Sequence, residues 1–213
     1  MPIVFGAAYS VYVRIVRLAL EEKGVAYRLD EVDIFAPGGP PAGYLKRHPF
    51  GRIPAFEHDG LRLFEAAAIC RYVDEAFRGP ALTPEPIAER ALMAQTIGML
   101  DSYAYRALVW DVYVELVAKP REGGTTDSDR VAGGLRTAET VAEVLAGQLI
   151  EHDYLAGDRV TLADLHAWPM VDCVLLTDAG ATLVKRHDRL AAWAALMAAR
   201  PASRTTAFPA GGG

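Results

Sequence analysis

The sequence predicts two successive domains of different class, a small α/β domain followed by an all-α helical bundle. In the first eighty residues, apolar runs of strand length alternate with helical periodicity, whereas every periodic segment after residue 86 has helical spacing. Residues 78–86 contain three prolines and a glycine, a composition typical of a linker. We therefore place the domains at residues 1–77 and 87–203, with a C-terminal tail at 204–213.

The elements of the first domain are predicted in the order β-α-β, loop, β-β-α. They are strands at residues 3–5 and 27–32, a helix from residue 11 to a glycine cap at residue 24, hairpin strands at 55–58 and 61–64, and a helix at 66–77. The pair Asp59-Gly60 favours a tight type I′ turn in the hairpin. Glycines and prolines at residues 36–41 predict an irregular loop.

The second domain is predicted to contain helices at residues 87–118, 127–151, 161–177 and 188–199. Gly123-Gly124 and Gly180 are interpreted as breaks between helices. Thr161 and Asp164 have the spacing of a capping box, so we expect a helix to begin there.

Composition excludes several classes of function. The net charge of −5 comes without a basic stripe, so no nucleic-acid partner is expected. No apolar run reaches the roughly 18 to 20 residues that span a bilayer, and no secretory signal is visible, so we expect a soluble cytoplasmic protein. Cys70 and Cys173 are expected to be buried thiols, and the five histidines lack the spacing of metal ligands, so no metal is expected.

The most informative motif is His-Pro-Phe-Gly-Arg-Ile-Pro-Ala at residues 48–55. Pro54 has no N–H to donate, so it must begin a strand or lie on an edge. The neighbouring peptide then stays available to pair with a ligand. This pattern predicts a site for a peptide-like molecule.

Four motifs in this order resemble those of the cytosolic glutathione transferases, whose first domain has a thioredoxin-like fold. They are Tyr9-Ser10 with Arg14, Pro-Phe-Gly-Arg-Ile-Pro-Ala at residues 49–55, Phe64-Glu65 with Ile69, and Thr-Leu-Ala-Asp at residues 161–164. The resemblance covers nearly the whole chain. It is closest to the serine-using bacterial, phi-like and theta-like branches, and it implies a homodimer that conjugates glutathione to small hydrophobic electrophiles.

Ser10 is the candidate for activating the thiol of glutathione. A thiol is only a few per cent ionised at neutral pH, and a hydroxyl at a helix N-terminus favours the thiolate through its hydrogen bond and the helix dipole. In an alternative interpretation, Ser10 only caps the helix. Tyr9 is a second candidate for donating the hydrogen bond to the thiolate. Tyr12 is interpreted as packing or as a wall of the substrate pocket.

The resemblance also implies the contacts that hold glutathione. Glu65 would accept the α-amino group of the γ-glutamyl unit, next to Ala66. The backbone of Ile53 would pair with the cysteinyl unit, with Pro54 in the cis form, and Arg52 would reach the glycine carboxylate. Simpler roles stay open for Glu65, as a first-turn acid, and for Arg52, as a solvated arginine.

Tyr103, Arg106, Trp110 and Tyr113 follow helical spacing and form one predicted stripe. Such a stripe is either part of the core or, as the resemblance implies for the first three, the lining of the electrophile pocket.

Two departures from the family pattern affect glutathione recognition and not the fold. Ala66 stands where the family has a serine, and Gly39-Pro40 stands where plant phi-type members have a basic pair. A non-catalytic binding or regulatory protein with a weakened glutathione site is therefore the alternative function. For the dimer, we expect contacts from Arg71, Tyr72 and a half-buried Phe50 loop.

Overall fold

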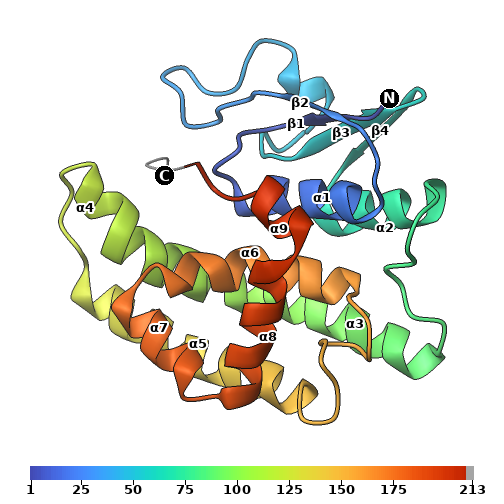
Figure 1. Ribbon diagram of the computed structural model, residues 1–213. Coiled ribbons are helices and arrows are strands. Elements are labelled where there is room, and N and C mark those ends of the chain that lie inside the picture. The colour runs from blue at the N-terminus through green and yellow to red at the C-terminus, as the bar shows by residue number, and fades with distance from the viewer. Residues whose placement is uncertain (210–213) are drawn as a thin grey trace. The chain divides into compact units, whose positions relative to one another are not determined.

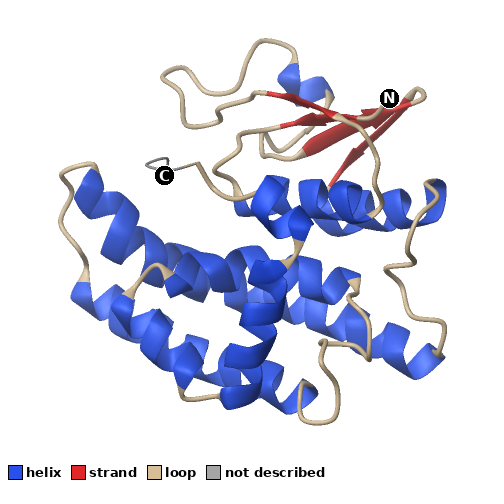
Figure 2. Ribbon diagram, viewed as in Figure 1, coloured by secondary structure: helices blue, strands red, loops and turns tan. Residues whose placement is uncertain are grey.

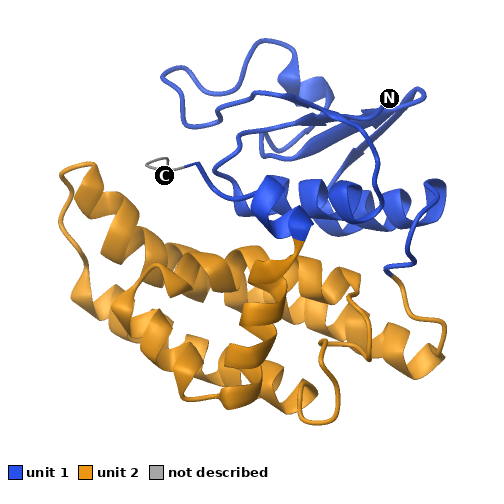
Figure 3. Cartoon of the chain, in the orientation of Figure 1, with its two compact units in different colours: residues 1–82, 201–213 blue, residues 83–200 orange. Residues whose placement is uncertain are grey.

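The computed structural model describes residues 1–209, which form two compact units (Figure 3). Unit 1 contains Met1–Leu82 together with the C-terminal segment from Pro201, and unit 2 contains Thr83–Arg200. The boundary after Leu82 falls inside the proline-rich stretch that is typical of a linker. The last four residues of the predicted C-terminal tail, 210–213, lie outside the described residues.

Unit 1 is built on a four-stranded mixed sheet in the order β2-β1-β3-β4 (Figures 1 and 2). The strands are β1 (Ile3–Phe5), β2 (Arg28–Asp30), β3 (Ala55–His58) and β4 (Leu61–Phe64). β1 pairs with β2 in parallel and with β3 antiparallel, and β3 and β4 form the hairpin. Asp59 and Gly60 both have positive φ angles, 48° and 82°, which confirms the type I′ turn.

Two helices, α1 (Val11–Glu22) and α2 (Ala66–Ala76), lie on one face of this sheet (Figure 2). Their apolar residues recur at helical spacing and are fully buried, as at Val13 and Leu20 in α1 and at Ile69 and Val73 in α2. A short 3-10 helix, η1 (Tyr44–Lys46), interrupts the long connection between β2 and β3. The predicted β-α-β and β-β-α order is confirmed.

The chain returns to unit 1 through α9 (Pro201–Thr205). Two arginines of α1 hold this segment: Arg14 Nη2 donates to the carbonyl of Ser203 at 3.4 Å, and Arg17 Nη2 donates to that of Thr205 at 3.3 Å. The Arg14 guanidinium also lies 4.3 Å from the ring centroid of Phe208. The sequence pattern did not indicate this return.

Unit 2 is entirely helical within its described residues (Figure 1). Its helices are α3 (Ile87–Met99), η2 (Leu100–Ala118), α4 (Lys119–Arg121), α5 (Ser128–Gln148), α6 (Leu162–Leu175), α7 (Asp178–Lys185) and α8 (Asp188–Ala199). The first three form one continuous helix that winds as a π-helix along η2, where the N–H of Lys119 reaches back five residues to the carbonyl of Val114. The four predicted helices are confirmed to within a few residues.

One prediction in this unit is wrong, because Gly180 lies inside α7 and does not separate two helices. Thr177 caps α7, and its hydroxyl accepts a hydrogen bond from the N–H of Gly180 at 2.9 Å. A Cβ at position 180 would collide with the carbonyl oxygen of Val174. Glycine is therefore required there for close packing.

The predicted capping box at the start of α6 is confirmed and lies at the centre of the unit. The fully buried Asp164 carboxylate accepts the N–H of Thr161 at 2.8 Å, the N–H of Leu155 at 2.9 Å and the indole N–H of Trp193 at 2.8 Å. Each donor would be an unsatisfied buried group without it. This carboxylate therefore joins α6, α8 and the loop before α6.

His166 in α6 gives unit 2 a predictable dependence on pH. The side chain is fully buried, its Nδ1 lies 3.2 Å from the carbonyl of Leu162, and burial lowers its pKa to about 4. Because the folded pKa lies below the unfolded value of about 6.5, the unfolded chain binds the proton more tightly. The stability that neutral His166 contributes is thus fully present above pH 6.5 and is lost as the pH falls toward 4.

We expect the free energy of unfolding to fall by about 2 kcal/mol between pH 7 and pH 5 because of this residue alone. His166→Leu should remove that part of the slope when urea unfolding is followed at several pH values. His152→Gln, at an exposed histidine, is the matched control. Equal slopes for His166→Leu and the wild type would contradict the prediction.

Candidate active site

The site residues of unit 1 meet at one end of the sheet because of its register. Phe5 at the end of β1 is opposite Ala55 at the start of β3, and Ala55 is opposite Phe64 at the end of β4. The residues that continue each strand, Gly6, Pro54 and Glu65, therefore leave the sheet at the same end. The loop after β2 starts there as well, since the N–H of Gly6 donates to the carbonyl of Asp30 at 3.0 Å.

The turn from β1 to α1 places Ser10 at this end. Gly6 packs closely against Ile53, whose Cβ would lie 3.2 Å from a Cβ at position 6. Ser10 is the N-cap of α1, and its Oγ accepts the N–H of Val13 at 3.4 Å. Capping uses the acceptor capacity of the hydroxyl and leaves its proton for another acceptor. The capping and thiol-activating interpretations of Ser10 are thus compatible.

The phenol of Tyr9, in contrast, has a partner of its own. Its OH donates to Asp33 Oδ1 at 2.8 Å, and its ring stacks on Phe35 with the centroids 6.3 Å apart. Burial, reinforced by the Asp33 carboxylate, raises the pKa of Tyr9 well above its usual value. Tyr9 is therefore a neutral phenol directed at the β2–β3 connection. Tyr12 lies half-buried in the first turn of α1.

The Ile53–Pro54 peptide bond is cis, as the resemblance implies. The paired part of β3 begins at Ala55, so the peptide of Ile53 lies just outside the ladder. Both Ile53 and Pro54 are buried, whereas the side chain of Arg52 is exposed. The buried Tyr44 fixes this turn, because its OH donates to the carbonyl of Arg52 at 2.8 Å.

Glu65 and Ala66 form the entry to α2. Glu65 has φ 69° and ψ 116°, a conformation that residues other than glycine rarely adopt. Such backbone strain is concentrated at functional sites. Its exposed carboxylate does not cap α2, so the first-turn N–H groups of this helix have no side-chain cap. Ala66, which follows, is buried.

His48 lies inside this cluster as a buried structural residue. Its ring is buried and lies 5.0 Å from that of Phe64 and 6.3 Å from that of Phe50. Burial lowers the pKa of His48, while the nearby Glu65 carboxylate opposes that shift. His48 therefore joins the Pro54 turn to the entry of α2. Its place directly before the Pro-Phe-Gly motif is the signal that could have indicated this role.

The predicted pocket residues Tyr103, Arg106 and Trp110 belong to unit 2. Tyr103 is 63% exposed, Trp110 is half-buried and Arg106 is exposed. Buried residues recur every three to four positions along η2, from Leu100 and Ala104 to Glu115 and Ala118, so Tyr103, Arg106 and Trp110 share a less buried face of this helix.

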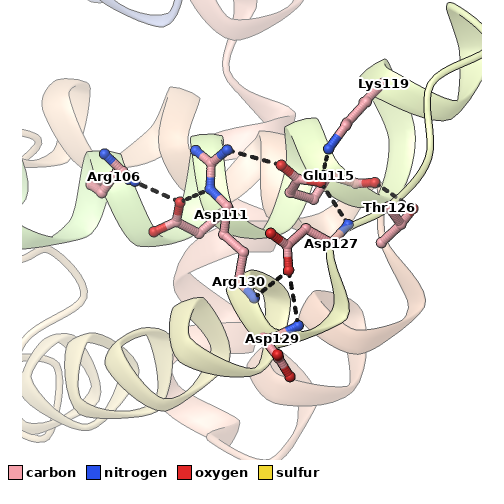
Figure 4. Close-up of polar contacts among 8 residues, drawn as sticks. All are labelled: Arg106, Asp111, Glu115, Lys119, Thr126, Asp127, Asp129 and Arg130. Atoms are coloured by element: carbon pink, nitrogen blue, oxygen red, sulfur yellow. Dashed lines mark hydrogen bonds and ion pairs between the residues drawn. The ribbon is translucent and has the colours of Figure 1, made fainter.

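Arg106 also belongs to an ion-pair network on this helix (Figure 4). Its Nε donates to Asp111 Oδ1 at 2.8 Å, and Arg130 from α5 binds the same oxygen at 2.6 Å and Glu115 at 2.9 Å. The hydrogen bond from Lys119 is the main cause that lowers the pKa of Glu115. The network therefore ties η2 to α5, and Arg106 has a structural partner before any substrate binds.

Comparisons with known proteins identify the family of this chain. Residues 9–76 match the model of the glutathione S-transferase N-terminal domain, and residues 107–201 match that of the C-terminal domain. Glutathione S-transferase 1 of Zea mays is 30% identical over 203 residues, which cover 95% of this chain and 94% of the relative. The crystal structure of glutathione transferase F7 from Populus trichocarpa has a TM-score of 0.85 at 29% identity, covering 97% of this chain and 98% of that one.

A second solved structure, glutathione S-transferase I from mais in complex with an atrazine glutathione conjugate, has a TM-score of 0.85 at 30% identity and covers 96% of this chain and 95% of its own. The chain therefore belongs to the glutathione S-transferase family, and it is similar to phi-class members of plants. Its fold is confirmed as a thioredoxin-like N-terminal domain followed by an all-helical domain.

Two negative observations apply to residues 1–209. None of the helices described there combines the length and apolarity that crossing a membrane requires. Nor do these residues contain a group of three or more histidine, cysteine, aspartate or glutamate side chains placed to hold a metal ion.

Proposed function

We propose that this protein is a cytoplasmic glutathione transferase that joins the glutathione thiolate to small hydrophobic electrophiles. Membership of the family supports glutathione as the co-substrate, and the relative crystallised with an atrazine glutathione conjugate supports an organic electrophile. The observation that carries the proposal is Ser10, which caps α1 at the end of the sheet where the cis-Pro54 turn and Glu65 also lie.

Ser10 would act by stabilising the thiolate. Its O–H proton is available to the sulfur while its oxygen caps α1, and the positive end of the α1 dipole favours the same negative charge. Tyr9 is the weaker candidate, because its proton already engages Asp33. The sulfur would then attack the electrophile, forming a carbon–sulfur bond and expelling a leaving group such as halide.

Glutathione would be held largely by main-chain groups. The peptide of Ile53 would pair with the cysteinyl unit beside Pro54, and Glu65 would bind the α-amino group of the γ-glutamyl unit. The first-turn N–H groups of α2, from Ala66 onward, would take its carboxylate, since a helix N-terminus favours an anion. Arg52 is exposed and would reach the glycine carboxylate.

The electrophile would meet apolar and aromatic side chains. Tyr12 in α1, with Tyr103 and Trp110 in η2, would provide them. Arg106 is a weaker member of this set, because its guanidinium is paired with Asp111.

Ser10→Ala tests the mechanism. We expect turnover of a chlorodinitrobenzene-type electrophile to fall tenfold or more, about 1.4 kcal/mol of barrier, while the affinity for glutathione and the fold change little. Steady-state kinetics with a circular dichroism check would measure this. Ser10→Thr, which keeps the hydroxyl, is the matched control. Full activity in Ser10→Ala would reject Ser10 as the activating group.

Ala66→Ser tests how glutathione is held. The missing hydroxyl and the missing basic pair at Gly39-Pro40 should together weaken binding by about 2 to 4 kcal/mol, to about the millimolar range. Restoring the hydroxyl should tighten binding about three- to tenfold in calorimetric titration. The neighbouring Ala67→Ser is the control. Micromolar binding that Ala66→Ser leaves unchanged would mean that another residue holds the γ-glutamyl end.

A second function is favoured by the same two departures. A binding or regulatory protein would keep the fold and lose the thiol site, and Ala66 with Gly39-Pro40 remove two contacts of that site. Retention on immobilised glutathione separates the two functions, because only a protein with a working glutathione site is retained and then eluted by free glutathione.

A homodimer is proposed with Phe50 at its contact. Phe50 is 72% exposed, which corrects the expectation of a half-buried loop, and an exposed phenylalanine at a turn suits insertion into a partner. Arg71 pairs with Glu75, and the Tyr72 OH lies 2.9 Å from His58 Nδ1, so both are already ordered.

Sedimentation at micromolar concentration should give twice the chain mass, and Phe50→Ser should shift the measured mass toward that of the monomer. Phe35→Ser, also at an exposed residue, should not.

A further inference from the structure

The connection between β2 and β3 crosses from one part of the candidate site to another. We call residues 33–43 the strap. At its start, Asp33 and Phe35 contact Tyr9, the neighbour of Ser10. Toward its end, Pro40 packs near Gly51, because a Cβ at position 51 would lie 3.8 Å from the Cγ of Pro40. The strap therefore runs from the Ser10 turn to the turn that contains Ile53.

The two attachments differ in strength. The far one is buried, because Tyr44 directly follows the strap, is 3% exposed and hydrogen-bonds Arg52. The near one is more exposed and includes a carboxylate oxygen that takes two hydrogen bonds: Asp33 Oδ1 accepts the Tyr9 OH at 2.8 Å and the N–H of Phe35 at 2.8 Å. Phe35 itself is 65% exposed, so little burial holds it.

The sequence between the attachments has little internal order, with one turn hydrogen bond from the N–H of Gly39 to the carbonyl of Ala36 at 2.9 Å. Gly38 and Gly39 have φ angles of 98° and 76°, and glycine loses the most conformational freedom when it is fixed. The strap contains no strand and no helix. The contacts of Tyr9 with Asp33 and Phe35 therefore contribute to the order of the strap at the Ser10 end.

We propose that Tyr9 is a positioning residue, which latches the strap beside Ser10 and so raises the affinity of the site for a thiol tripeptide. The proposal rests on the proposed function, and it gives the Tyr9 phenol a role other than activation of the thiol. A latched strap offers a fixed wall between the Ser10 and Ile53 turns. An unlatched strap must be ordered each time the ligand binds, which weakens binding.

The first measurement uses the free protein and does not depend on glutathione. In Tyr9→Phe, which keeps the stacked ring and loses only the OH, we expect the hydrogen-bonded amides of Phe35 and Gly39 to exchange hydrogen about tenfold faster than in the wild type. Asp33→Ala should do the same, whereas Asp33→Asn, which keeps an acceptor oxygen, should restore protection. Tyr27→Phe is the matched control, since its OH contacts Arg17 and not the strap. Unchanged exchange in Tyr9→Phe overturns the latch.

The second measurement uses reduced glutathione. Tyr9→Phe and Asp33→Ala should each weaken its binding about three- to tenfold, and the double variant should lose no more than Asp33→Ala alone, because the Tyr9–Asp33 hydrogen bond is already absent in that variant. The KM for glutathione should rise accordingly, while kcat at saturating glutathione falls less than threefold. A tenfold loss of kcat with KM preserved would overturn the proposal and assign Tyr9 to thiol activation. If the wild type does not bind glutathione, the proposed function fails and the affinity role of Tyr9 fails with it, while the exchange data still decide whether the latch exists.

Discussion

The pairing of β3 with β1 is the constraint on which the rest of the site depends. Because Ala55 is opposite both Phe5 and Phe64, three chain segments must leave the sheet at the same end. The helices that follow β1 and β4 begin there, so the N-termini of α1 and α2 belong to one region. Pro54 ends the ladder at that point, since it has no N–H to contribute. A register shift of one residue would turn the side chains of β3 to the other face and separate these groups.

The hydroxyl groups of Ser10 and Tyr9 are adjacent at this end of the sheet but have different hydrogen-bond partners. The Ser10 oxygen accepts a backbone N–H and leaves the hydroxyl proton available, whereas the Tyr9 phenol donates its hydrogen bond to Asp33. The high pKa of Tyr9 follows from the same burial and the same carboxylate. A phenol in this state is a poor source of a proton for a thiolate but a stable hydrogen-bond donor for a loop. The sequence placed both residues at the helix start and left the choice between them open, because Asp33 lies more than twenty residues away.

Local patterns predicted the elements of the fold well, and long-range contacts explain what was missed. The Asp59-Gly60 turn and the capping box at Thr161 are short-range signals, and both are confirmed. Gly180 was taken for a break because glycine usually disfavours a helix, but its need for close contact with Val174 is visible only in three dimensions. The return of the C-terminal segment to Arg14 could not be predicted for the same reason.

The candidate site likewise has features that the local sequence predicted and features that only the structure shows. The motif around Pro54 indicated a place for a peptide-like ligand, because the absence of one N–H is a property of the residue itself. The burial of His48 between Phe50 and Phe64, and the strained backbone of Glu65, arise from how the turns meet.

Main-chain groups and helix ends therefore form most of the site, and they persist as long as the register does. The side chains that we propose to adjust glutathione affinity, at positions 9, 33 and 66, take no part in the strand pairing. This separation explains how a chain can keep the family fold at 30% identity while two of the contacts expected for glutathione are absent.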